Sequence, residues 1–132
     1  MTQRLELYKC QVCGNLVEIL NSGVGELVCC SQPMNLLIPH TTEDQYMNDH
    51  HLPVIEESED GGKSIRIGST QHDMSEVHHI EFIETISKDR KNVHLKFLDL
   101  GERPIIDYKC RTRTNTARCH CNKHGLWEGE LD

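Results

Sequence analysis

Short runs in which hydrophobic and polar residues alternate recur along the chain and predict β-strands. Near the start, Leu5 and Leu7 alternate with polar residues, and a second apolar run covers residues 17–20. Residues 64–68 alternate cleanly between polar and apolar positions. A period of two residues is typical of a strand with one buried face, whereas an amphipathic helix has a longer period. Since no stretch has a convincing helical period, we expect an all-β protein.

Longer alternating runs predict further strands in the second half of the chain, at residues 78–86, 93–97 and 106–113. In the first of these runs we expect Ile80, Phe82 and Ile86 to share one face of the strand. Candidate turns separate the runs, at residues 60–62, 88–90, 100–101 and 114–115. Short strands with turns at this spacing are typical of an antiparallel β-sandwich.

The chain divides by composition into two parts. With only 5% aromatic residues in the whole chain, residues 1–38 cannot bury much of a core. We expect this small module to need a bound ion to stay folded. Pro33 and Pro39 bracket its exit, and the polar residues 41–48 are interpreted as a linker. Residues 39–132 are expected to form the β-sandwich domain.

Charge and cysteine usage limit the possible partners and compartment. A formal net charge of −7 argues against nucleic acid as a partner, because phosphate binding needs a basic surface. No apolar run approaches the length needed to span a membrane. The cysteine count is odd, no signal peptide precedes the cysteines, and most of their spacings are those of metal ligands. We therefore expect a protein of the reducing cytoplasm.

Four cysteines of the first module form a candidate metal site. Cys10 and Cys13 lie in a tight turn that points two thiolates at one ion, and the adjacent Cys29 and Cys30 supply two more. Tetrahedral coordination by sulfur indicates zinc or iron. Zinc ribbons normally repeat the two-residue spacer, and neighbouring ligands should strain the tetrahedron. The spacing favours iron and leaves zinc as the alternative.

Four histidines and one cysteine in the rest of the chain form a second candidate site. They are His51, His72, His78, Cys121 and His124. Structural zinc closes a tetrahedron with four ligands and has no use for a fifth, so this set suits a redox metal better. Five ligands leave one face open for a small ligand. Neutral imidazoles leave the metal its charge and a thiolate donates electron density, which suits a small anionic oxidant.

Two cysteines belong to neither set. Cys110 and Cys119 are expected to be small buried thiols on adjacent strands. A two-residue turn at Thr114 and Asn115 would place them directly opposite each other, where a disulfide is geometrically possible. Trp127 closely follows the second candidate site, and we expect it to shield that site from water.

The motifs around the candidate ligands resemble those of a known family. The four-cysteine module looks like desulforedoxin. Three features resemble the superoxide reductase (neelaredoxin) domain, namely His51-Leu52-Pro53-Val54, the step from His72 to His78, and Cys121-Asn122-Lys123-His124-Gly125-Leu126-Trp127. Together the two parts resemble desulfoferrodoxin, the two-iron superoxide reductase, over essentially the whole chain. The adjacent cysteine pair combined with the Cys-Asn-x-His-Gly ending makes the resemblance specific.

This resemblance implies an Fe(Cys)4 centre in residues 1–38 and an immunoglobulin-like β-sandwich that carries the catalytic iron in residues 39–132. Four equatorial histidines would surround that iron, matching His51, His72, His78 and His124, with the cysteine that matches Cys121 as axial ligand. The implied reaction is the one-electron reduction of superoxide to hydrogen peroxide, which uses two protons and releases no dioxygen. The resemblance also implies an external donor such as rubredoxin, and dimerisation through the small module.

The chain departs from the family just before the first histidine ligand. Family members usually carry Glu-Lys there, and this chain has Asp49-His50. The family's glutamate can occupy the open position of the oxidised iron, whereas Asp49 is one methylene shorter. The family's lysine attracts superoxide and helps to protonate the product, and His50 can do so only when protonated. Because a free imidazole titrates near pH ~6.5, we expect activity to fall more steeply above neutral pH than in lysine-containing relatives.

Two other functions use only part of the proposed ligands. In the first, the four-cysteine ion makes the chain an electron-transfer or metal-binding protein, and the histidine site is vestigial or holds zinc. The second is a zinc-ribbon regulator, against which the acidic charge counts. Neither function requires a fifth ligand such as Cys121 beside four histidines.

Overall fold

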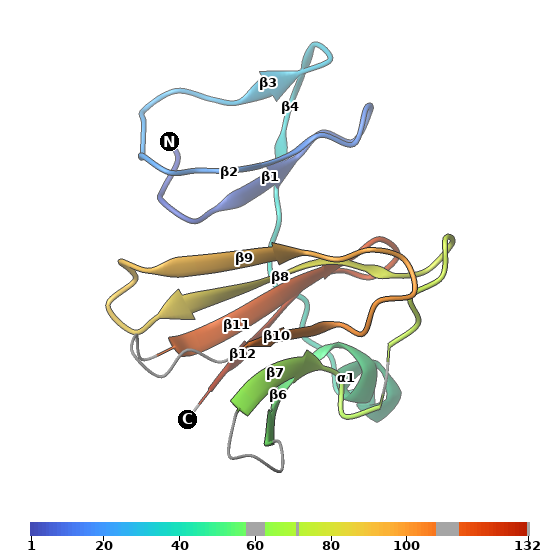
Figure 1. The fold of residues 1–132 in the computed structure, drawn as a ribbon. Coiled ribbons are helices and arrows are strands. Elements are labelled where there is room, and N and C mark those ends of the chain that lie inside the picture. The colour runs from blue at the N-terminus through green and yellow to red at the C-terminus, as the bar shows by residue number, and fades with distance from the viewer. Residues whose placement is uncertain (58–62, 71, 108–113, 132) are drawn as a thin grey trace. The chain divides into compact units, whose positions relative to one another are not determined.

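The computed structural model describes residues 1–57, 63–70, 72–107 and 114–131, and its elements are almost all β-strands (Figure 1). The chain divides into two compact units, Met1–Ile38 and Pro39–Asp132, each of which is described by itself below. The predicted all-β class is confirmed, because the described residues contain a single short helix. Within those residues no helix combines the length and the apolar character needed to cross a membrane.

The first unit is a small sheet with a separate hairpin. Its sheet has the order β2-β1-β5, in which β1 (Leu7–Lys9) pairs antiparallel with both β2 (Leu16–Glu18) and β5 (Asn35–Leu36). A two-stranded hairpin joins β3 (Val28–Cys29) to β4 (Gln32–Pro33). Few side chains of this unit are buried, chiefly Leu5, Leu7, Cys10 and Ile19. So small an apolar core supports the expectation that the unit depends on a bound ion.

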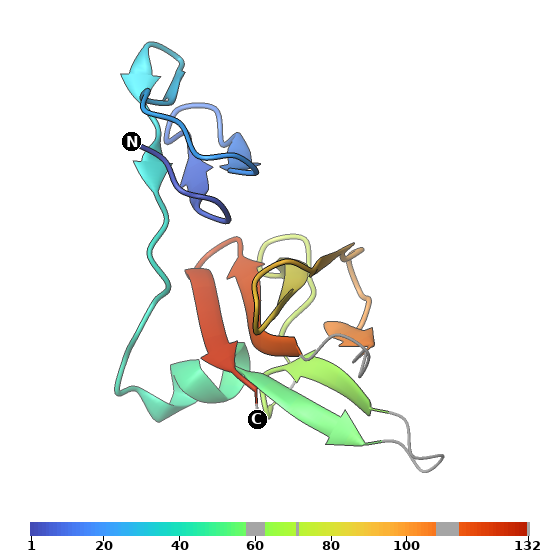
Figure 2. The same ribbon diagram turned by 90° about the vertical axis from the view of Figure 1, so that its left-hand side faces the viewer.

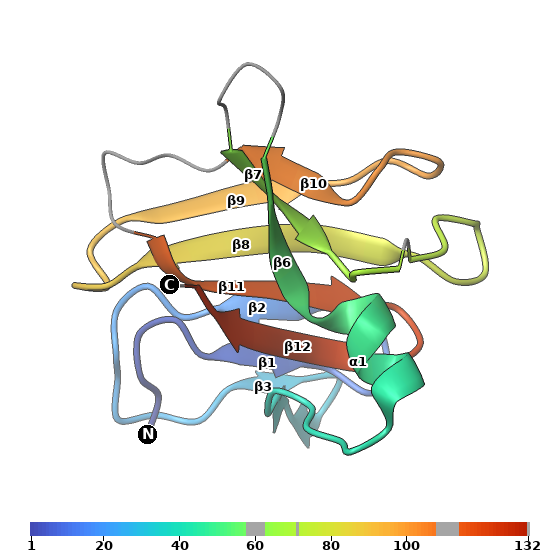
Figure 3. The ribbon, with the colours of Figure 1, turned by 90° about the horizontal axis from the view of Figure 1, so that it is seen from below.

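The second unit is a β-sandwich of two antiparallel sheets that lie face to face (Figures 2 and 3). One sheet has the order β10-β7-β6, made of β6 (Pro53–Glu57), β7 (Lys63–Ile67) and β10 (Ile105–Asp107). The other has the order β12-β11-β8-β9, made of β8 (Ile80–Ser87), β9 (Val93–Phe97), β11 (Thr114–Cys121) and β12 (Gly125–Glu130). Both sheets contribute to one buried core, which confirms the predicted sandwich.

A β-bulge in β8 changes which of its residues face the core. Along β11, His120 pairs with Phe82 but Cys121 pairs with Ile80, so Glu81 is the extra residue. Ile80 therefore lies in the core together with Ile83, while the ring of Phe82 stacks against His120 with the centroids 5.9 Å apart. The prediction that Ile80 and Phe82 share one face is wrong, because strict alternation does not survive a bulge.

The described helix, α1 (Gln45–His51), lies where a polar linker was predicted. Asp44 is its N-cap, and the carboxylate accepts hydrogen bonds from the backbone N–H groups of Tyr46 and Met47. Met47 packs against the core and His51, one turn later, is buried. The linker prediction is wrong because a helix this short has only one pair of inward-facing residues a turn apart, Met47 and His51. One pair is not enough to reveal a helical period in the sequence.

The two-residue turn predicted at Thr114 and Asn115, which would place Cys110 opposite Cys119, is wrong. Residues 114 and 115 belong to β11 rather than to a turn, and Cys119 lies opposite Ile83 on β8 and Trp127 on β12. Both of its cross-strand positions are thus filled, and Cys110 lies outside the described residues. Cys119 is a fully buried thiol, as predicted, and donates a hydrogen bond to the His51 carbonyl at 3.5 Å.

Candidate metal centres

Four cysteines of the first unit converge on one point. The sulfur atoms of Cys10, Cys13, Cys29 and Cys30 all lie within 4.8 Å of one another. Cys10 follows directly after β1, and its carbonyl accepts a hydrogen bond from the Gly14 N–H at 3.0 Å. Gly14 has φ +86°, a conformation that favours glycine and closes this turn tightly. The turn places Cys13 Sγ 3.6 Å from Cys29 Sγ.

The adjacent cysteines reach the same point because of an unusual turn. Cys29 ends β3, and Cys30 and Ser31 connect it to β4 with φ values of +52° and +61°. Two left-handed residues in a two-residue hairpin are typical of a type I′ turn. This backbone brings the sulfur atoms of the neighbouring cysteines to 3.9 Å. Left-handed backbone is unfavourable for residues other than glycine, so this turn lowers the stability of the folded unit. Such unfavourable backbone is typical of functional sites.

Cys10 and Cys30 of this cluster differ in acidity. Hydrogen bonds from the backbone N–H groups of Cys13 and Val12 lower the pKa of Cys10 to about 6. Hydrogen bonding to Cys13 and Cys10 raises the pKa of Cys30 to about 12. One thiolate therefore forms readily and further ionisation is opposed. A divalent cation would stabilise several thiolates at once, so the donor set fits Zn²⁺ or iron.

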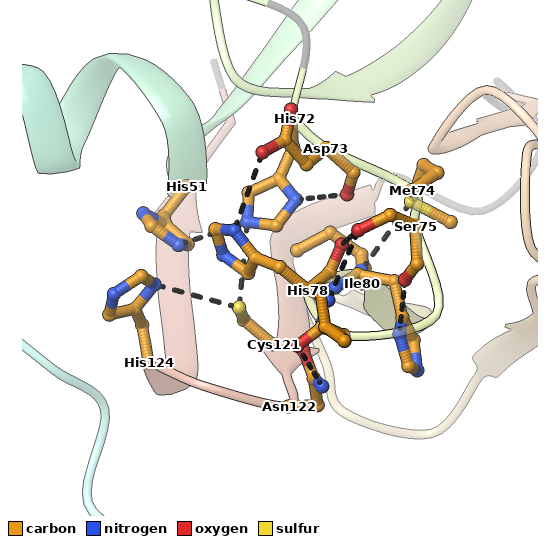
Figure 4. Close-up of polar contacts among 12 residues, drawn as sticks. His51, His72, Asp73, Met74, Ser75, His78, Ile80, Cys121, Asn122 and His124 are labelled. Atoms are coloured by element: carbon orange, nitrogen blue, oxygen red, sulfur yellow. Dashed lines mark hydrogen bonds and ion pairs between the residues drawn. The ribbon is translucent and has the colours of Figure 1, made fainter.

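Residues from four segments of the second unit form the other cluster. His51 ends α1, His72 and His78 lie in the loop between β7 and β8, Cys121 ends β11, and His124 lies in the turn before β12. One nitrogen of each histidine and the sulfur of Cys121 all lie within 4.8 Å of one another. Figure 4 shows the five side chains pointing toward a common centre.

Hydrogen bonds outside the cluster orient two of the imidazoles. His51 Nδ1 lies 2.7 Å from the Met47 carbonyl oxygen, and His72 Nδ1 lies 2.6 Å from that of Asp73. A carbonyl only accepts, so Nδ1 carries the proton in both rings and Nε2 is left bare. The two Nε2 atoms lie 3.1 Å apart. Two lone pairs facing each other at this distance fit a shared metal ion.

The other two imidazoles complete the set through different nitrogens. His78 Nδ1 lies 3.5 Å from Asp73 Oδ2, and its Nε2 is buried without a hydrogen-bond partner in the described part of the chain. His124 instead turns Nδ1 toward Cys121, 3.7 Å from the sulfur. A buried nitrogen without a partner is rare in folded proteins, and a metal ion would satisfy it. This geometry therefore fits a bound metal.

Burial favours the neutral form of His51, His72 and His124. It lowers the pKa of His51 to about 4, and it also lowers the pKa of His72 and His124. Burial raises the pKa of the Cys121 thiol, against hydrogen bonds from the backbone N–H groups of Lys123 and His124 that lower it. Neutral nitrogens and a thiol that ionises only beside a cation suit a transition metal such as iron.

Trp127 contacts two of the five residues. Its ring stacks on His51, with the centroids 4.4 Å apart and the planes 14° from parallel. Its Nε1–H donates to the His124 carbonyl at 3.1 Å. Trp127 is fully buried, as the predicted shielding of the site requires. The hydrogen bond to His124 was not predicted, because a contact between strand and turn leaves no signal in the sequence.

Asp49 and His50, the predicted catalytic residues, lie outside the cluster of five. Both are half-buried near the end of α1. The Asp49 carboxylate accepts a hydrogen bond from Gln45 Nε2 at 2.7 Å. His50 Nδ1 donates to the Tyr46 carbonyl at 2.7 Å, and its ring packs on the ring of Tyr46. His50 therefore keeps Nε2 for other contacts, and the roles of both residues stay predictions.

Comparison with known proteins matches both units to one family. The family described as "Desulfoferrodoxin, N-terminal domain" matches residues 2–37, and "Desulfoferrodoxin" matches residues 42–130. Desulfoferrodoxin from Desulfarculus baarsii is 42% identical over 130 residues, 98% of this chain and 99% of that protein. A desulfoferrodoxin homolog from Archaeoglobus fulgidus is 43% identical, over 97% of this chain and 98% of its own. The crystal structure of the superoxide reductase from Treponema pallidum aligns with 98% of this chain and 99% of its own chain, with a TM-score of 0.71 and 20% sequence identity. This similarity shows a shared fold.

Proposed function

This chain belongs to the desulfoferrodoxin family, and from that membership we propose that it is a superoxide reductase. One superoxide, one electron and two protons give one hydrogen peroxide, and no dioxygen forms. The observation that carries the proposal is the convergence of four imidazole nitrogens and one thiol sulfur within 4.8 Å. Neither an electron carrier nor a structural zinc site needs this set of five donors.

The proposed ligands of the catalytic iron are the five residues of this cluster, His51, His72, His78, Cys121 and His124. Iron held by these five donors would supply a one-electron couple to a small molecule bound beside them. The chain's part is to hold the donors and to keep water away from the thiolate. The tautomers of His51 and His72 are fixed by backbone carbonyls, and Trp127 covers His51 and holds the backbone of His124.

His50 and Asp49 are proposed to act on the substrate from the end of α1. Both immediately precede His51, and His50 has Nε2 available for a proton or a hydrogen bond. A protonated His50 would attract an anion and donate a proton to the product. His50→Gln should slow the reaction of the reduced protein with superoxide, and His50→Lys should restore or exceed the native rate. Equal rates in all three proteins would exclude this role.

The four cysteines of residues 1–38 are proposed to hold the second iron, and residues 39–132 to form the catalytic domain. Turnover requires an electron donor, for which we propose a rubredoxin-like protein. The exposed Cys13 and Cys30 would let such a partner approach the small centre. Exposed apolar side chains of this unit, Val12, Leu20, Val24 and Val28, support a homodimer formed through it. The free thiols of both clusters support a reducing cytoplasm.

The proposal is tested by the visible absorption of anaerobically purified protein through a redox titration, with iron and zinc counted on the same sample. Two chromophores should oxidise in separate steps, one of ferric tetrathiolate type and one a broad thiolate-to-iron band in the red. Adding superoxide to the fully reduced protein should produce the second band at once. A protein that fills with zinc and stays colourless after iron reconstitution would contradict the proposal.

A further inference from the structure

Asn122 lies in the turn between two proposed ligands and is hydrogen-bonded to the loop that carries a third (Figure 4). Its Oδ1 accepts the backbone N–H of His79 at 2.8 Å, and its Nδ2 donates to the Val77 carbonyl at 3.1 Å. The Asn122 backbone N–H also donates to the His79 carbonyl at 3.1 Å. These bonds enclose His78, which lies between Val77 and His79. The side chain thus joins the Cys121–His124 turn to the loop of His78.

The other hydrogen bonds of residues 75–79 run within the loop itself. Ser75 and His78 exchange backbone hydrogen bonds at 3.0 and 3.3 Å, and the Ser75 hydroxyl donates to the His78 carbonyl at 3.2 Å. These bonds shape the turn but attach it only to itself. Val77 is 70% exposed and gives no apolar anchor, so the nearest one is Met74, just before this segment, which packs against the core. Among the hydrogen bonds of the described residues, those that tie residues 75–79 to another element run to Asn122.

An asparagine suits this position for a chemical reason. The loop presents an N–H on His79 and a carbonyl on Val77, and a planar amide offers one acceptor and one donor to the pair. A serine hydroxyl could accept from His79 but is too short to reach Val77 as well. An alanine would leave both backbone groups to water. The side-chain amide therefore forms the same donor and acceptor pair with the loop that the backbone of a neighbouring strand would form.

We propose that Asn122 is a positioning residue that sets His78 against Cys121 and His124. The proposal rests on the metal site described under the proposed function. His78 Nε2 is the buried nitrogen without a partner, and its position depends on this loop. Loosening the loop should remove one of five donors for part of the time. Loss of partners outside the ligand set typically weakens metal binding about 10–100-fold, so we expect Asn122→Ala to release the catalytic iron about tenfold faster.

The matched control is Asp89→Ala at the opposite end of β8. Asp89 also makes two side-chain hydrogen bonds, accepting from the Ser87 hydroxyl at 2.6 Å and the Lys91 N–H at 3.0 Å. It shapes the turn between β8 and β9 and lies far along the strand from Ile80, where the loop of His78 ends. A general loss of stability would affect both variants alike. A positioning role would affect iron release only in Asn122→Ala.

The experiment measures iron release to a chelator from the loaded full-length proteins, with the two irons followed by their separate absorption bands. The catalytic iron should leave Asn122→Ala about tenfold faster, with the tetrathiolate iron unchanged and Asp89→Ala like the native protein. Amide hydrogen exchange of residues 75–80 should also quicken in Asn122→Ala alone. If that variant does not fold, Asn122→Ser should show an intermediate rate. Native release and exchange rates in the Asn122 variants would overturn the proposal.

These readouts do not depend on activity. If the native protein failed to reduce superoxide while Asn122→Ala still lost its iron and its exchange protection, the proposed function would fall and the positioning role would stand. If the native protein were an active reductase whose iron release did not respond to Asn122, the positioning role would fall and the function would stand.

Discussion

Gly68 is the position at which one added methyl group should most disturb the proposed catalytic site. Its φ is +86°, and a Cβ atom there would lie 2.5 Å from the Thr70 carbonyl oxygen. The same atom would lie 2.9 Å from the carbonyl oxygens of Asp49 and His50. These are backbone atoms, which cannot swing aside as the tip of a long side chain can. Gly68→Ala must therefore push its loop away from the end of α1.

Two contributions set the expected loss of stability. A residue other than glycine in the left-handed region costs about 1 kcal/mol. Moving the loop also breaks or strains two hydrogen bonds, from the Gly68 N–H to the Leu52 carbonyl at 2.8 Å and from the Thr70 N–H to the Asp49 carbonyl at 3.0 Å. With about 1 kcal/mol net for each bond, the free energy of unfolding should fall by about 3 kcal/mol.

Gly101→Ala is the matched control. Gly101 has φ +81°, and nothing lies within 4 Å of a Cβ atom placed there, so only the conformational cost of about 1 kcal/mol applies. Denaturant unfolding can be followed through Trp127, the single tryptophan of the chain. Gly68→Ala alone should also release the catalytic iron faster to a chelator, because α1 carries His51. Equal losses of stability in the two variants, or native iron release from Gly68→Ala, would refute this reasoning.

Three further results are expected. Trp127→Phe keeps a ring against His51 but loses the N–H that is bonded to the His124 carbonyl. The thiolate-to-iron band should therefore shift, and a chelator should remove the iron about tenfold faster. An unchanged band and an unchanged rate would contradict this. Burial lowers the pKa of His51 from its ordinary 6.5 to about 4. Between pH 4 and pH 6.5 the unfolded state therefore binds more protons than the folded state. The metal-free protein should keep its full stability above pH ~6.5 and lose it toward pH 4 in urea titrations, and constant stability over that range would be inconsistent with the burial of His51. Cys30→Ser should abolish the ferric tetrathiolate band and leave the other band intact, and loss of both bands would argue against two separate sites.

The residues of both clusters could be predicted from the sequence because their spacing carries chemistry. Cys10 and Cys13 share one turn, and the Cys121–His124 segment lies within another, so each pair is already local in the chain. The alternation in residues 64–68 likewise predicted β7 (Lys63–Ile67), since a strand with one buried face leaves that pattern directly. Features that depend on residues close together in the chain could therefore be predicted from the sequence.

The features that were missed depend on contacts between distant segments or on very short elements. Helix α1 begins at the Asp44 cap and is stabilised where Met47 packs on the core, a contact made only in the folded unit. The bulge at Glu81 leaves no mark on the alternation of β8. Asn122 belongs to a motif noted in the sequence, but its bonds to the His78 loop join segments far apart in the chain.

The central claim is that this chain reduces superoxide without dismutating it, and the product balance of a single turnover tests it most directly. Fully reduced protein is mixed with a limiting amount of superoxide under anaerobic conditions, and hydrogen peroxide and dioxygen are both measured. Each superoxide consumed should yield one hydrogen peroxide and no dioxygen, and Cys121→Ser should lose the reaction. Release of dioxygen in step with peroxide, or superoxide that decays no faster than in buffer, would contradict the account.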